Sequence, residues 1–560
     1  MKKTDNEMNF VITLEFKPDK WQRDILNQAV EFGRRIQNGA LNVCECLYED
    51  FKNSGLSAKD WKADRRYIVR YDRNKHRFSA ELVDKDSDEG LPIYSGKALL
   101  NGNTCGVIAN RIYNLLKANY PNKYGTFGDV INTLSAELIG IKRVARQAES
   151  LMAYGEEVRY KRFCEVNSFP CRIGGKQLLS TNTFDFDSET PTKLNLKLRS
   201  KKSKKQNLKG KSKWSWMSFV KPSPRDVYLL SNLNMAETLK SPFEIVRKMI
   251  RGKERWFFQL NCKGAPFNKG YVLGTGRVGL DIGTSTVAIS SDESVTIDNL
   301  PLPIDHQRRI SAINRKLDRS RRATNPECYN EDGTFKKGTR ITVKSKRYLK
   351  LQRQLADIQR KEAAYKKNMQ GHMANEIVSR GNVFITEADG KQNMMKKAKE
   401  TKVKKNGKCA SKKRFGKSIG QHAPSGLKNK IRNRVTFLGG RFYEANTFVT
   451  KASQFDHTNG ECHKVGVKVR RKTLSDGAVV QRDMYSAYCL QHLDFDKIGL
   501  WQHDPSEKKK KVVCKECVYD QDEMKKHFEA FRVMQEAELN AIEDGKKHVY
   551  ESVVGKKTLK

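Results

Sequence analysis

Hydrophobic residues recur at helical spacing through most of the first quarter of the chain. Over 20–47, apolar positions three and four apart predict one long amphipathic helix or two, and further helices are predicted over 103–116 and 129–151. Residues 57–82 are polar and predict no element clearly. Ahead of the helices, 9–16 alternate between apolar and polar side chains, which predicts a strand. The pattern therefore indicates a mostly helical lobe that follows a single strand.

The periodicity changes after about residue 156. Short runs rich in β-branched and aromatic residues, separated by turn residues, predict strands at 159–163, 227–230, 245–250 and 256–260. Such runs are typical of a small β-barrel or sandwich, with which the strand at the start of the chain is expected to pair. The helical lobe is then an insertion that this β domain brackets.

The second half of the chain mixes strands and helices. Residues 277–290 predict a strong strand, 310–317 and 348–369 predict basic helices, 382–386 predict another strand, and a last helix is predicted over about 523–544. No internal repeat is evident, and the length favours several domains.

Composition and charge narrow the function classes. Among 560 residues, Lys and Arg number 108 and Asp and Glu 64, so 108 − 64 gives a formal net charge of +44. Self-repulsion on this scale opposes compaction unless a polyanion neutralises it, and nucleic acid is the expected one; an acidic membrane surface is the alternative. We find no run of about 18 apolar residues and no secretory signal, so we expect an intracellular protein without a membrane span. Its 12 cysteines lack framework spacing and are expected to be mostly reduced thiols.

Two basic segments are candidates for nucleic-acid contact. In the first, lysines precede Trp214 and Trp216, and charge beside aromatic rings suits a phosphate backbone with stacked bases. A solvated loop is the alternative for this segment. The second, 391–434, holds sixteen Lys or Arg and one acid. The residues that we single out are Lys201, Lys202, Lys204 and Lys205 in the first segment and Lys412, Lys413 and Arg414 in the second.

One acid stands inside the strongest predicted strand. The run Leu280-Asp-Ile-Gly-Thr-Ser-Thr286 places Asp281 between apolar residues, where a carboxylate is costly to desolvate unless it is paired or holds a metal. RNase H-like nucleases carry a metal-binding Asp on their first strand, whereas actin-like and sugar kinases use Asp-x-Gly-Thr to cradle phosphates. A strand-end Asp that caps its own turn is the third interpretation, and the motif alone does not choose among them.

Two further acids favour the nuclease. Glu387 ends an apolar strand and Asp483 opens a predicted helix, so each also has an ordinary interpretation, as a strand-end acid and as an N-cap. Asp389 is a rival to Glu387. A nuclease needs several carboxylates because two divalent ions, about 4 Å apart, bracket the scissile phosphate, and such hard cations take oxygen ligands.

These three segments, in this order, resemble the split RuvC domain of the transposon-encoded TnpB nucleases and the related type V CRISPR effectors. The family pattern Arg-Asp-x-x-(Asn/Ser)-Ala reads Arg482-Asp-Met-Tyr-Ser-Ala487 here, and Lys451-Ala-Ser-Gln454 resembles the segment that enters the family's zinc-finger insert. The stretch 314–325 looks like the basic region after the first strand, with Arg315, Lys316, Arg319, Arg321 and Arg322.

The resemblance implies a multidomain α+β fold, with an RNase H-like (RuvC) α/β nuclease domain, a wedge-like β-barrel and a helical recognition lobe. The implied divisions are the first barrel strand (1–18), the helical lobe (19–155), the rest of the barrel (156–270), the first RuvC-like segment (271–302), a basic helical insertion (303–378), the second RuvC-like segment (379–450), a degenerate zinc-finger-like insert (451–478), the third RuvC-like segment (479–500) and a basic, helical tail (501–560).

The same resemblance implies an RNA-guided DNA endonuclease in the prokaryotic cytoplasm. Asp281, Glu387 and Asp483 would hold two Mg²⁺ and catalyse hydrolysis, and the partners would be a guide RNA and target double-stranded DNA with a short adjacent motif. Arg482 would contact the scissile phosphate or form an ion pair with a neighbouring acid. The alternatives are a guide-dependent DNA-binding regulator without cleavage and, more distantly, an actin-like ATPase or kinase.

The sequence departs from the family at the zinc insert. The usual two Cys-x-x-Cys pairs are missing, and only Cys462 remains, flanked by His457 and His463, so we expect this insert to lack zinc. Cys489, His492, Cys514 and Cys517 form a weak alternative site, whose ordinary interpretation is one buried thiol and an exposed, reduced pair.

Overall fold

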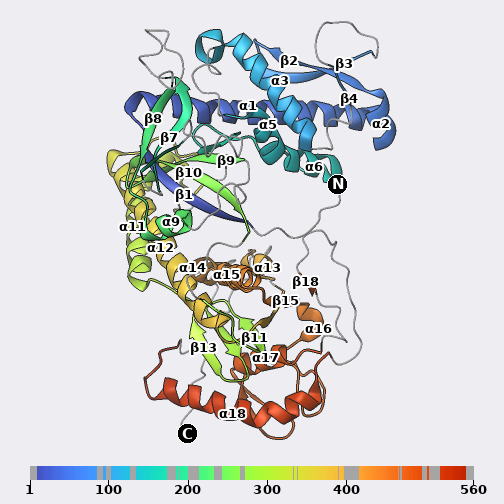
Figure 1. Ribbon diagram of the computed structural model, residues 1–560, viewed down its shortest axis with the longest axis vertical. Coiled ribbons are helices and arrows are strands. Elements are labelled where there is room, and N and C mark those ends of the chain that lie inside the picture. Colours follow the sequence, from blue (N-terminus) through green and yellow to red (C-terminus); the bar gives the residue numbers. More distant parts are fainter. Residues whose placement is uncertain are drawn as a thin grey trace. The chain divides into compact units, whose positions relative to one another are not determined.

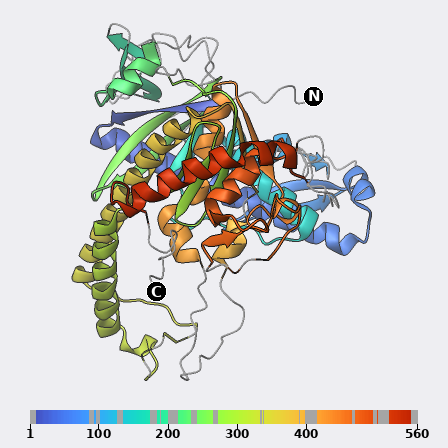
Figure 2. The same cartoon turned by 90° about the horizontal axis from the view of Figure 1, so that it is seen from below.

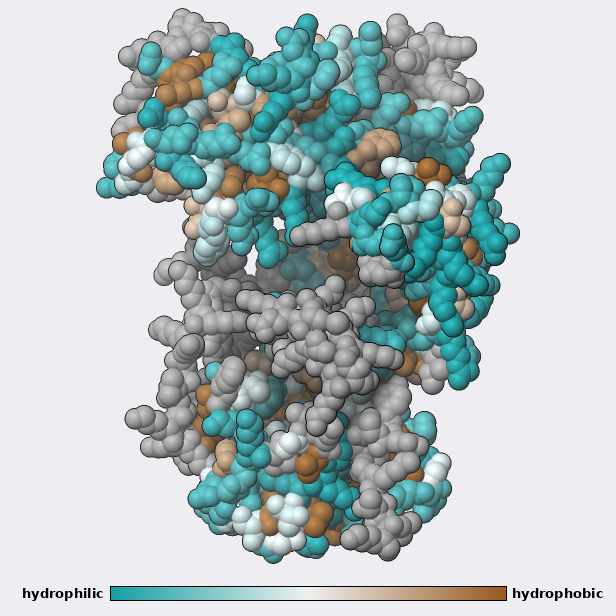
Figure 3. All heavy atoms as spheres, turned by 180° about the vertical axis from the view of Figure 1, so that it is seen from behind, coloured by the Kyte–Doolittle hydropathy of each residue, from teal (hydrophilic) through white to brown (hydrophobic). Residues whose placement is uncertain are grey.

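The computed structural model is mixed α+β and divides into two compact units, Met1–Phe267 and Asn268–Lys560 (Figure 1). The structure describes residues 9–84, 93–95, 102–125, 134–172, 184–187, 190–199, 214–231, 242–264, 271–331, 333, 335–336, 338–388, 390–396, 415–464, 466, 469–494, 501–502 and 518–549. On the face seen in Figure 3, most of the described surface is hydrophilic, with scattered apolar residues.

The first unit is built on a seven-stranded sheet in the order β5-β9-β10-β1-β8-β7-β6. As expected, β1 pairs with a late strand, β10, from Asn9 opposite Lys263 to Phe16 opposite Trp256. Among the described residues no pairing joins β5 to β6, the two ends of this order, so no closed barrel is found. The strands are β1 Asn9–Lys17, β5 Ser168–Cys171, β6 Phe184–Asp187, β7 Thr190–Arg199, β8 Trp214–Phe219, β9 Phe243–Ile250 and β10 Lys253–Lys263.

Along the chain, the segment between β1 and the later strands of this sheet is mostly helical. Its longest member, α1 (Lys20–Ser54), is one helix, which the side chain of Gln22 caps by accepting a hydrogen bond from Asp19 N at 2.8 Å. The other helices are α3 Gly102–Asn119, the π-helical turns Pro121–Gly125 and Gly140–Val144, α5 Ala136–Ile139 and α6 Ala145–Tyr154. None of the described helices of the chain combines the length and apolar character that crossing a bilayer requires.

The polar segment 57–82 forms elements that its pattern did not predict. It contains α2 (Ala58–Asp64) and the hairpin of β2 (Arg66–Asp72) and β3 (Arg77–Val83), to which β4 (Ile93–Ser95) adds a third strand. Trp61 and Tyr67 both donate hydrogen bonds to Asp50 Oδ2, at 2.8 and 2.7 Å. These long-range contacts to α1 hold the segment in place, and local periodicity does not report them.

Two predicted strands are wrong. Residues 227–230 belong to the helix α9 (Pro224–Ser231), which begins where Ser223 and Asp226 exchange hydrogen bonds between side chains and backbone. Residues 159–163 pair with no strand; instead, the Asn38 amide of α1 binds both the N–H and the carbonyl of Lys161, at 2.9 and 2.8 Å. A helix side chain thus takes the place of a sheet partner.

The second unit contains a six-stranded sheet in the order β13-β12-β11-β14-β15-β18. The first three strands run antiparallel, whereas β11, β14 and β15 run parallel. The predicted strand 277–290 is therefore a hairpin, because residues 283–285 turn the chain between β11 and β12. The strands are β11 Arg277–Ile282, β12 Thr286–Ser290, β13 Val295–Asn299, β14 Val383–Glu387, β15 Arg441–Ala445 and β18 Trp501–Gln502.

Helices cover both faces of this sheet (Figures 1 and 2). One face, with Val278, Leu280 and Phe384, packs against α12 (Lys346–Val378) and α15 (Pro424–Phe437). The opposite face, with Ile385 and Tyr443, packs against α17 (Arg482–Gln491) and α18 (Gln521–Glu543). The remaining elements are α11 Ile304–Thr324, the 3₁₀ turn Pro326–Cys328, α13 Lys391–Met395, α14 Gly416–His422, α16 Thr447–Thr450, β16 Arg471–Thr473 and β17 Val479–Gln481.

Candidate active site

Asp281 and Glu387 occupy neighbouring positions at the carboxyl ends of two paired strands. In the parallel ladder of β11 and β14, Leu280 lies opposite Thr386, so the next positions along the strands are those of the two acids. Because side chains alternate across a strand, Asp281 and Glu387 lie on the face opposite Leu280 and Phe384, which is the face that α17 covers.

The helix α17 brings the third acid to the same face. It crosses β11 so closely that a Cβ on Gly279 would lie 1.9 Å from Ala487 O, and only a residue without a side chain fits there. Asp483 is in the first turn of this helix, one turn before Ala487, and Ser486 of the same helix forms a side-chain hydrogen bond with Asp281. The close crossing therefore directs the start of α17 toward the ends of β11 and β14.

The other two carboxylates act electrostatically on Asp281. Burial, followed by the charges of Asp483 and Glu387, raises the pKa of Asp281 to about 7. Burial also raises the pKa of Glu387, although hydrogen bonds from Thr450 Oγ1, at 3.0 Å, and from the Ala452 backbone favour its ionised form. A carboxyl group whose pKa burial and neighbouring charges raise toward neutral is typical of a functional site.

Three cations balance the acids in the structure. The charge of Lys391 acts on both strand-end acids, and its Nζ donates to Ile282 O at 2.6 Å. Asp483 forms ion pairs with Arg470, at 3.1 Å, and with Arg482, at 2.9 Å. As placed, no three Asp, Glu, His or Cys side chains within the described residues converge tightly enough to hold a metal ion. Asp389 lies outside the described residues.

The donor set nevertheless fits a hard divalent cation. Three carboxylates supply the oxygen ligands that Mg²⁺ prefers, and a bound cation would offset the burial and the neighbouring negative charges that raise the pKa of Asp281. The ion pairs of Asp483 with two arginines compete with metal coordination by the same oxygens.

The basic residues of α11 divide into two groups. Arg315 and Arg319 are exposed and line a cavity of about 730 Å³, whereas Arg321 and Arg322 form ion pairs with Asp318 at 2.7 and 2.9 Å. The first pair is therefore better placed to meet a phosphate. The other candidates, Lys201, Lys202, Lys204, Lys205, Lys412, Lys413 and Arg414, lie outside the described residues.

Two of the four weak zinc candidates are described. Cys489 is fully buried in α17, and burial raises its pKa, which opposes the thiolate that zinc requires. His492 follows the helix, and its Nδ1 lies 3.0 Å from Tyr488 O. Cys514 and Cys517 lie outside the described residues.

The buried carboxylate of Asp456 links the two ends of the insert of residues 451–478. Asp456 is 1% exposed and accepts four hydrogen bonds: Oδ1 from the backbone and hydroxyl of Thr458, at 3.0 and 2.6 Å, and Oδ2 from those of Ser475, at 2.8 and 2.9 Å. Nearby, the buried Lys472 ammonium donates to the carbonyls of Gln454 and Phe455. Hydrogen bonds thus join the two ends of the insert.

Asp456→Ala is expected to destabilise this unit by about 1–3 kcal/mol, because buried donors lose their acceptor. The hydrogen bonds lower the pKa of Asp456, so its contribution is present above about pH 4, the ordinary range of an Asp, and is lost as the pH falls through the lowered value. Thermal unfolding across the acid range should show the difference from wild type shrinking as the pH falls. Asp476→Ala, an exposed acid of the same insert, is the matched control; an equal loss in both would contradict the assignment.

Sequence reasoning missed several residues of the site. Lys391, Arg470 and Gly279 carry no local pattern that marks them as part of the site, because strand register and helix crossing bring them to it. Ser486 had a signal, because it is the Ser of the Arg-Asp-x-x-Ser-Ala motif. Arg482 is paired with Asp483, which was one of the two roles considered for it.

No protein-family model and no curated protein matches the chain. Three similar solved structures are a Cas12f1 complex with sgRNA and target DNA (12% identity, 86% of this chain and 98% of that chain, TM-score 0.42), a CRISPR-Cas12f ternary complex (12%, 90% and 100%, 0.23) and the mini-RNA-guided endonuclease CRISPR-Cas phi3 (11%, 85% and 91%, 0.29). All three are CRISPR effectors, and each is similar to this chain at a TM-score below 0.5.

Proposed function

We propose that the chain is an RNA-guided DNA endonuclease that cuts its target at Asp281, Glu387 and Asp483. One observation carries the proposal: two acids end adjacent parallel strands on the face that receives a third acid from α17. Burial, followed by the charges of Asp483 and Glu387, raises the pKa of Asp281, as expected where three carboxylates lie near one another.

We further propose that the second unit is an RNase H-like nuclease domain. Such domains carry a metal-binding Asp on the first strand, and β11 is both the first strand of this unit and the strand that bears Asp281. Its pairing with the antiparallel β12 on one side and the parallel β14 on the other supports the assignment.

In the proposed mechanism, the residues of the chain orient the carboxylates. Ser486 holds Asp281, while Thr450 and the Ala452 backbone hold Glu387. Before the three carboxylates can bind a cation together, Asp281 must lose its proton and Asp483 must release at least one of its two arginines. When bound, two Mg²⁺ would supply a water of lowered pKa and stabilise the leaving 3′ oxygen.

The proposed partners are a guide RNA and double-stranded target DNA. A net charge of +44 and exposed arginines such as Arg315 and Arg319 suit phosphate contacts that carry no sequence information. Pairing between the guide and the target strand would then read the sequence, with protein groups reading a short adjacent motif.

A cleavage assay with the purified full chain tests this function. RNA that copurifies with the chain is sequenced and reprogrammed toward a chosen duplex, and cleavage is followed with Mg²⁺. We expect cuts only in the duplex that matches the guide, and none with a chelator or a mismatched guide. Cutting without any RNA would contradict the guided mechanism.

A second candidate is a guide-dependent DNA-binding regulator that does not cut. The observation in its favour is that Asp483 forms ion pairs with both Arg470 and Arg482, which keep its oxygens occupied. The same assay separates the candidates, because specific binding of the matching duplex without any nick would support the regulator.

A further inference from the structure

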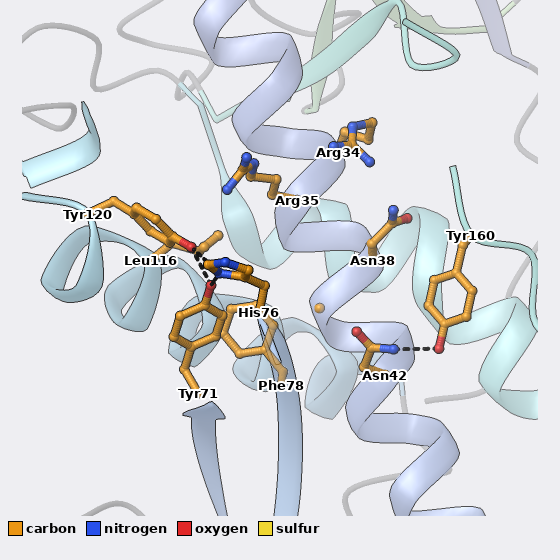
Figure 4. A pocket seen from close by; sticks show the side chains of 11 residues that line it. Arg34, Arg35, Asn38, Asn42, Tyr71, His76, Phe78, Leu116, Tyr120 and Tyr160 are labelled. Carbon is orange, nitrogen blue, oxygen red and sulfur yellow. Dashed lines mark hydrogen bonds between the residues drawn. The ribbon is translucent and has the colours of Figure 1, made fainter. Parts of the chain in front are cut away.

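The first unit contains a cavity of about 610 Å³ that the nuclease proposal does not use (Figure 4). Its walls come from α1, from the β2–β3 hairpin and from the end of α3, with Tyr160 closing one side. This volume lies within the range of about 300–1,000 Å³ that is usual for small-ligand sites. All the lining residues belong to one unit, so the cavity is formed by that unit alone.

The floor of the cavity is apolar and closely packed. Phe78 is buried against α1, where a Cβ on Gly39 would lie 2.7 Å from its ring, so the glycine admits the ring. Leu116 extends the same floor. A flat, apolar ligand face can rest on such a surface without leaving polar groups unpaired.

One wall is aromatic and is fixed by its own hydrogen bonds. The hydroxyls of Tyr71 and Tyr120 contact each other, and both lie near His76 Nδ1, at 3.3 and 3.2 Å. His76 adopts a left-handed backbone conformation, with φ of 49°, in a turn that Asp72 holds through its side chain. A residue other than glycine is strained there, and such strain is retained where the surrounding structure requires that side chain.

The opposite wall offers a cation. Arg34 is fully engaged, since Glu31 binds it at 2.6 and 2.8 Å and its Nη1 donates to Lys161 O. Arg35 is engaged only in part: its buried Nε forms an ion pair with Glu31 at 3.5 Å and has no closer acceptor among the described residues. Its guanidinium lies 5.6 Å from the centre of the Tyr120 ring (Figure 4). Arg35 therefore has donors available for an anion beside an aromatic surface.

An oriented amide completes the cavity. Asn42 Nδ2 donates to Tyr160 OH at 2.6 Å, and that hydroxyl donates in turn to Glu45. Figure 4 shows the amide nitrogen directed toward Tyr160 and the carbonyl oxygen on the other side, toward the cavity. The oxygen is thus fixed as an acceptor for a donor on the ligand.

We infer that this cavity binds one unpaired nucleotide of a nucleic-acid strand. A base stacks on the Tyr71, His76 and Tyr120 wall, its polar edge donates to Asn42, and Arg35 receives the phosphate. The charge of the chain favours a nucleotide within a strand over a free one. The inference goes beyond the proposed cleavage and does not depend on the catalytic acids.

The test uses the full chain, freed of RNA and kept in a chelator so that no cutting occurs. Short single-stranded oligonucleotides carry 2-aminopurine, whose fluorescence falls when the base stacks. We expect quenching with wild type, and affinity at least about tenfold weaker in Arg35→Ala and His76→Gly, the scale of losing one stacked base. Arg23→Ala, which removes the same charge from an exposed site on α1, should change affinity less than about twofold.

His76→Gly also limits the risk of misfolding, because glycine adopts the same φ without strain, which offsets part of the cost of losing the contacts with Tyr71 and Tyr120, so the melting temperature should stay close to that of wild type. Ribo- and deoxyribo-oligonucleotides distinguish an RNA from a DNA strand. Equal weakening in Arg23→Ala and Arg35→Ala would overturn the inference, as would unchanged quenching in His76→Gly. Displacement by mononucleotides, with no oligonucleotide quenching, would assign the cavity to a free nucleotide and overturn the strand as its source.

Discussion

Asp281→Asn is expected to lower DNA cleavage by at least about 10³-fold, the scale of removing a catalytic residue. The substitution keeps the shape and the hydrogen bond with Ser486 but removes the charge that the proposed Mg²⁺ site requires. Guide RNA retention and target binding should be nearly unchanged, because those contacts lie elsewhere. Cleavage and filter-binding assays on the same preparation would measure both.

The same variant should be more stable than wild type at alkaline pH without metal. The pKa of Asp281 rises from 3.8 to about 7 on folding, so the folded state holds a proton that the unfolded state has lost. Stability of the wild type therefore falls as the pH rises from about 4 to about 7, with a penalty on the order of a few kcal/mol that the amide avoids. Melting temperatures of the two proteins should converge near pH 4 and separate by about pH 8.

Metal provides a readout that does not depend on cleavage. Mg²⁺ is expected to raise the melting temperature of wild type, since a ligand that binds only the folded state stabilises it, and to leave Asp281→Asn unchanged. Asp305→Asn, an exposed acid in the first turn of α11, is the control and should behave as wild type in every assay. If Asp281→Asn still cut DNA, or if it unfolded at neutral pH, the role of Asp281 would be structural and not catalytic.

Gly279→Ala is expected to lower both stability and cleavage strongly. The new Cβ would lie 1.9 Å from Ala487 O and 2.6 Å from Gln491 N, and both are backbone atoms that cannot rotate away. The helix α17 must shift and carry Asp483 with it, so we expect about 3 kcal/mol of destabilisation or more, at the upper end of overpacking effects. Chemical denaturation would measure the loss of stability, and residual cleavage would be assayed well below the melting temperature.

Gly420→Ala supplies the matched control for this effect. The same methyl group there has no atom within 4 Å, and alanine is favoured over glycine within a helix such as α14, so stability should be unchanged or rise by up to about 1 kcal/mol. If Gly279→Ala matched this control, the close crossing of α17 over β11 would be refuted.

Local pattern predicted most elements whose side chains pack with regular spacing. The alternation of residues 9–16 corresponds to β1, and the apolar spacing of 20–47 to α1, because burial of one face imposes that period. Prediction failed where long-range contacts decided the outcome. Residues 159–163 contact Asn38 instead of a strand, and the hairpin within 57–82 depends on Asp50, which accepts from two distant aromatic residues.

The sequence by itself determined the chemistry of the proposed site: a large excess of positive charge, and three acids that lie inside a predicted strand, at the end of another and at the start of a predicted helix. Only the tertiary structure decided that Asp281 and Glu387 share one sheet face, that Gly279 lets α17 approach it, and that Arg470 lies beside Asp483. It also decided that Arg35 and His76 line one cavity. The physical reason is that these relations depend on strand register and helix crossing, which long-range packing sets and residue spacing does not record.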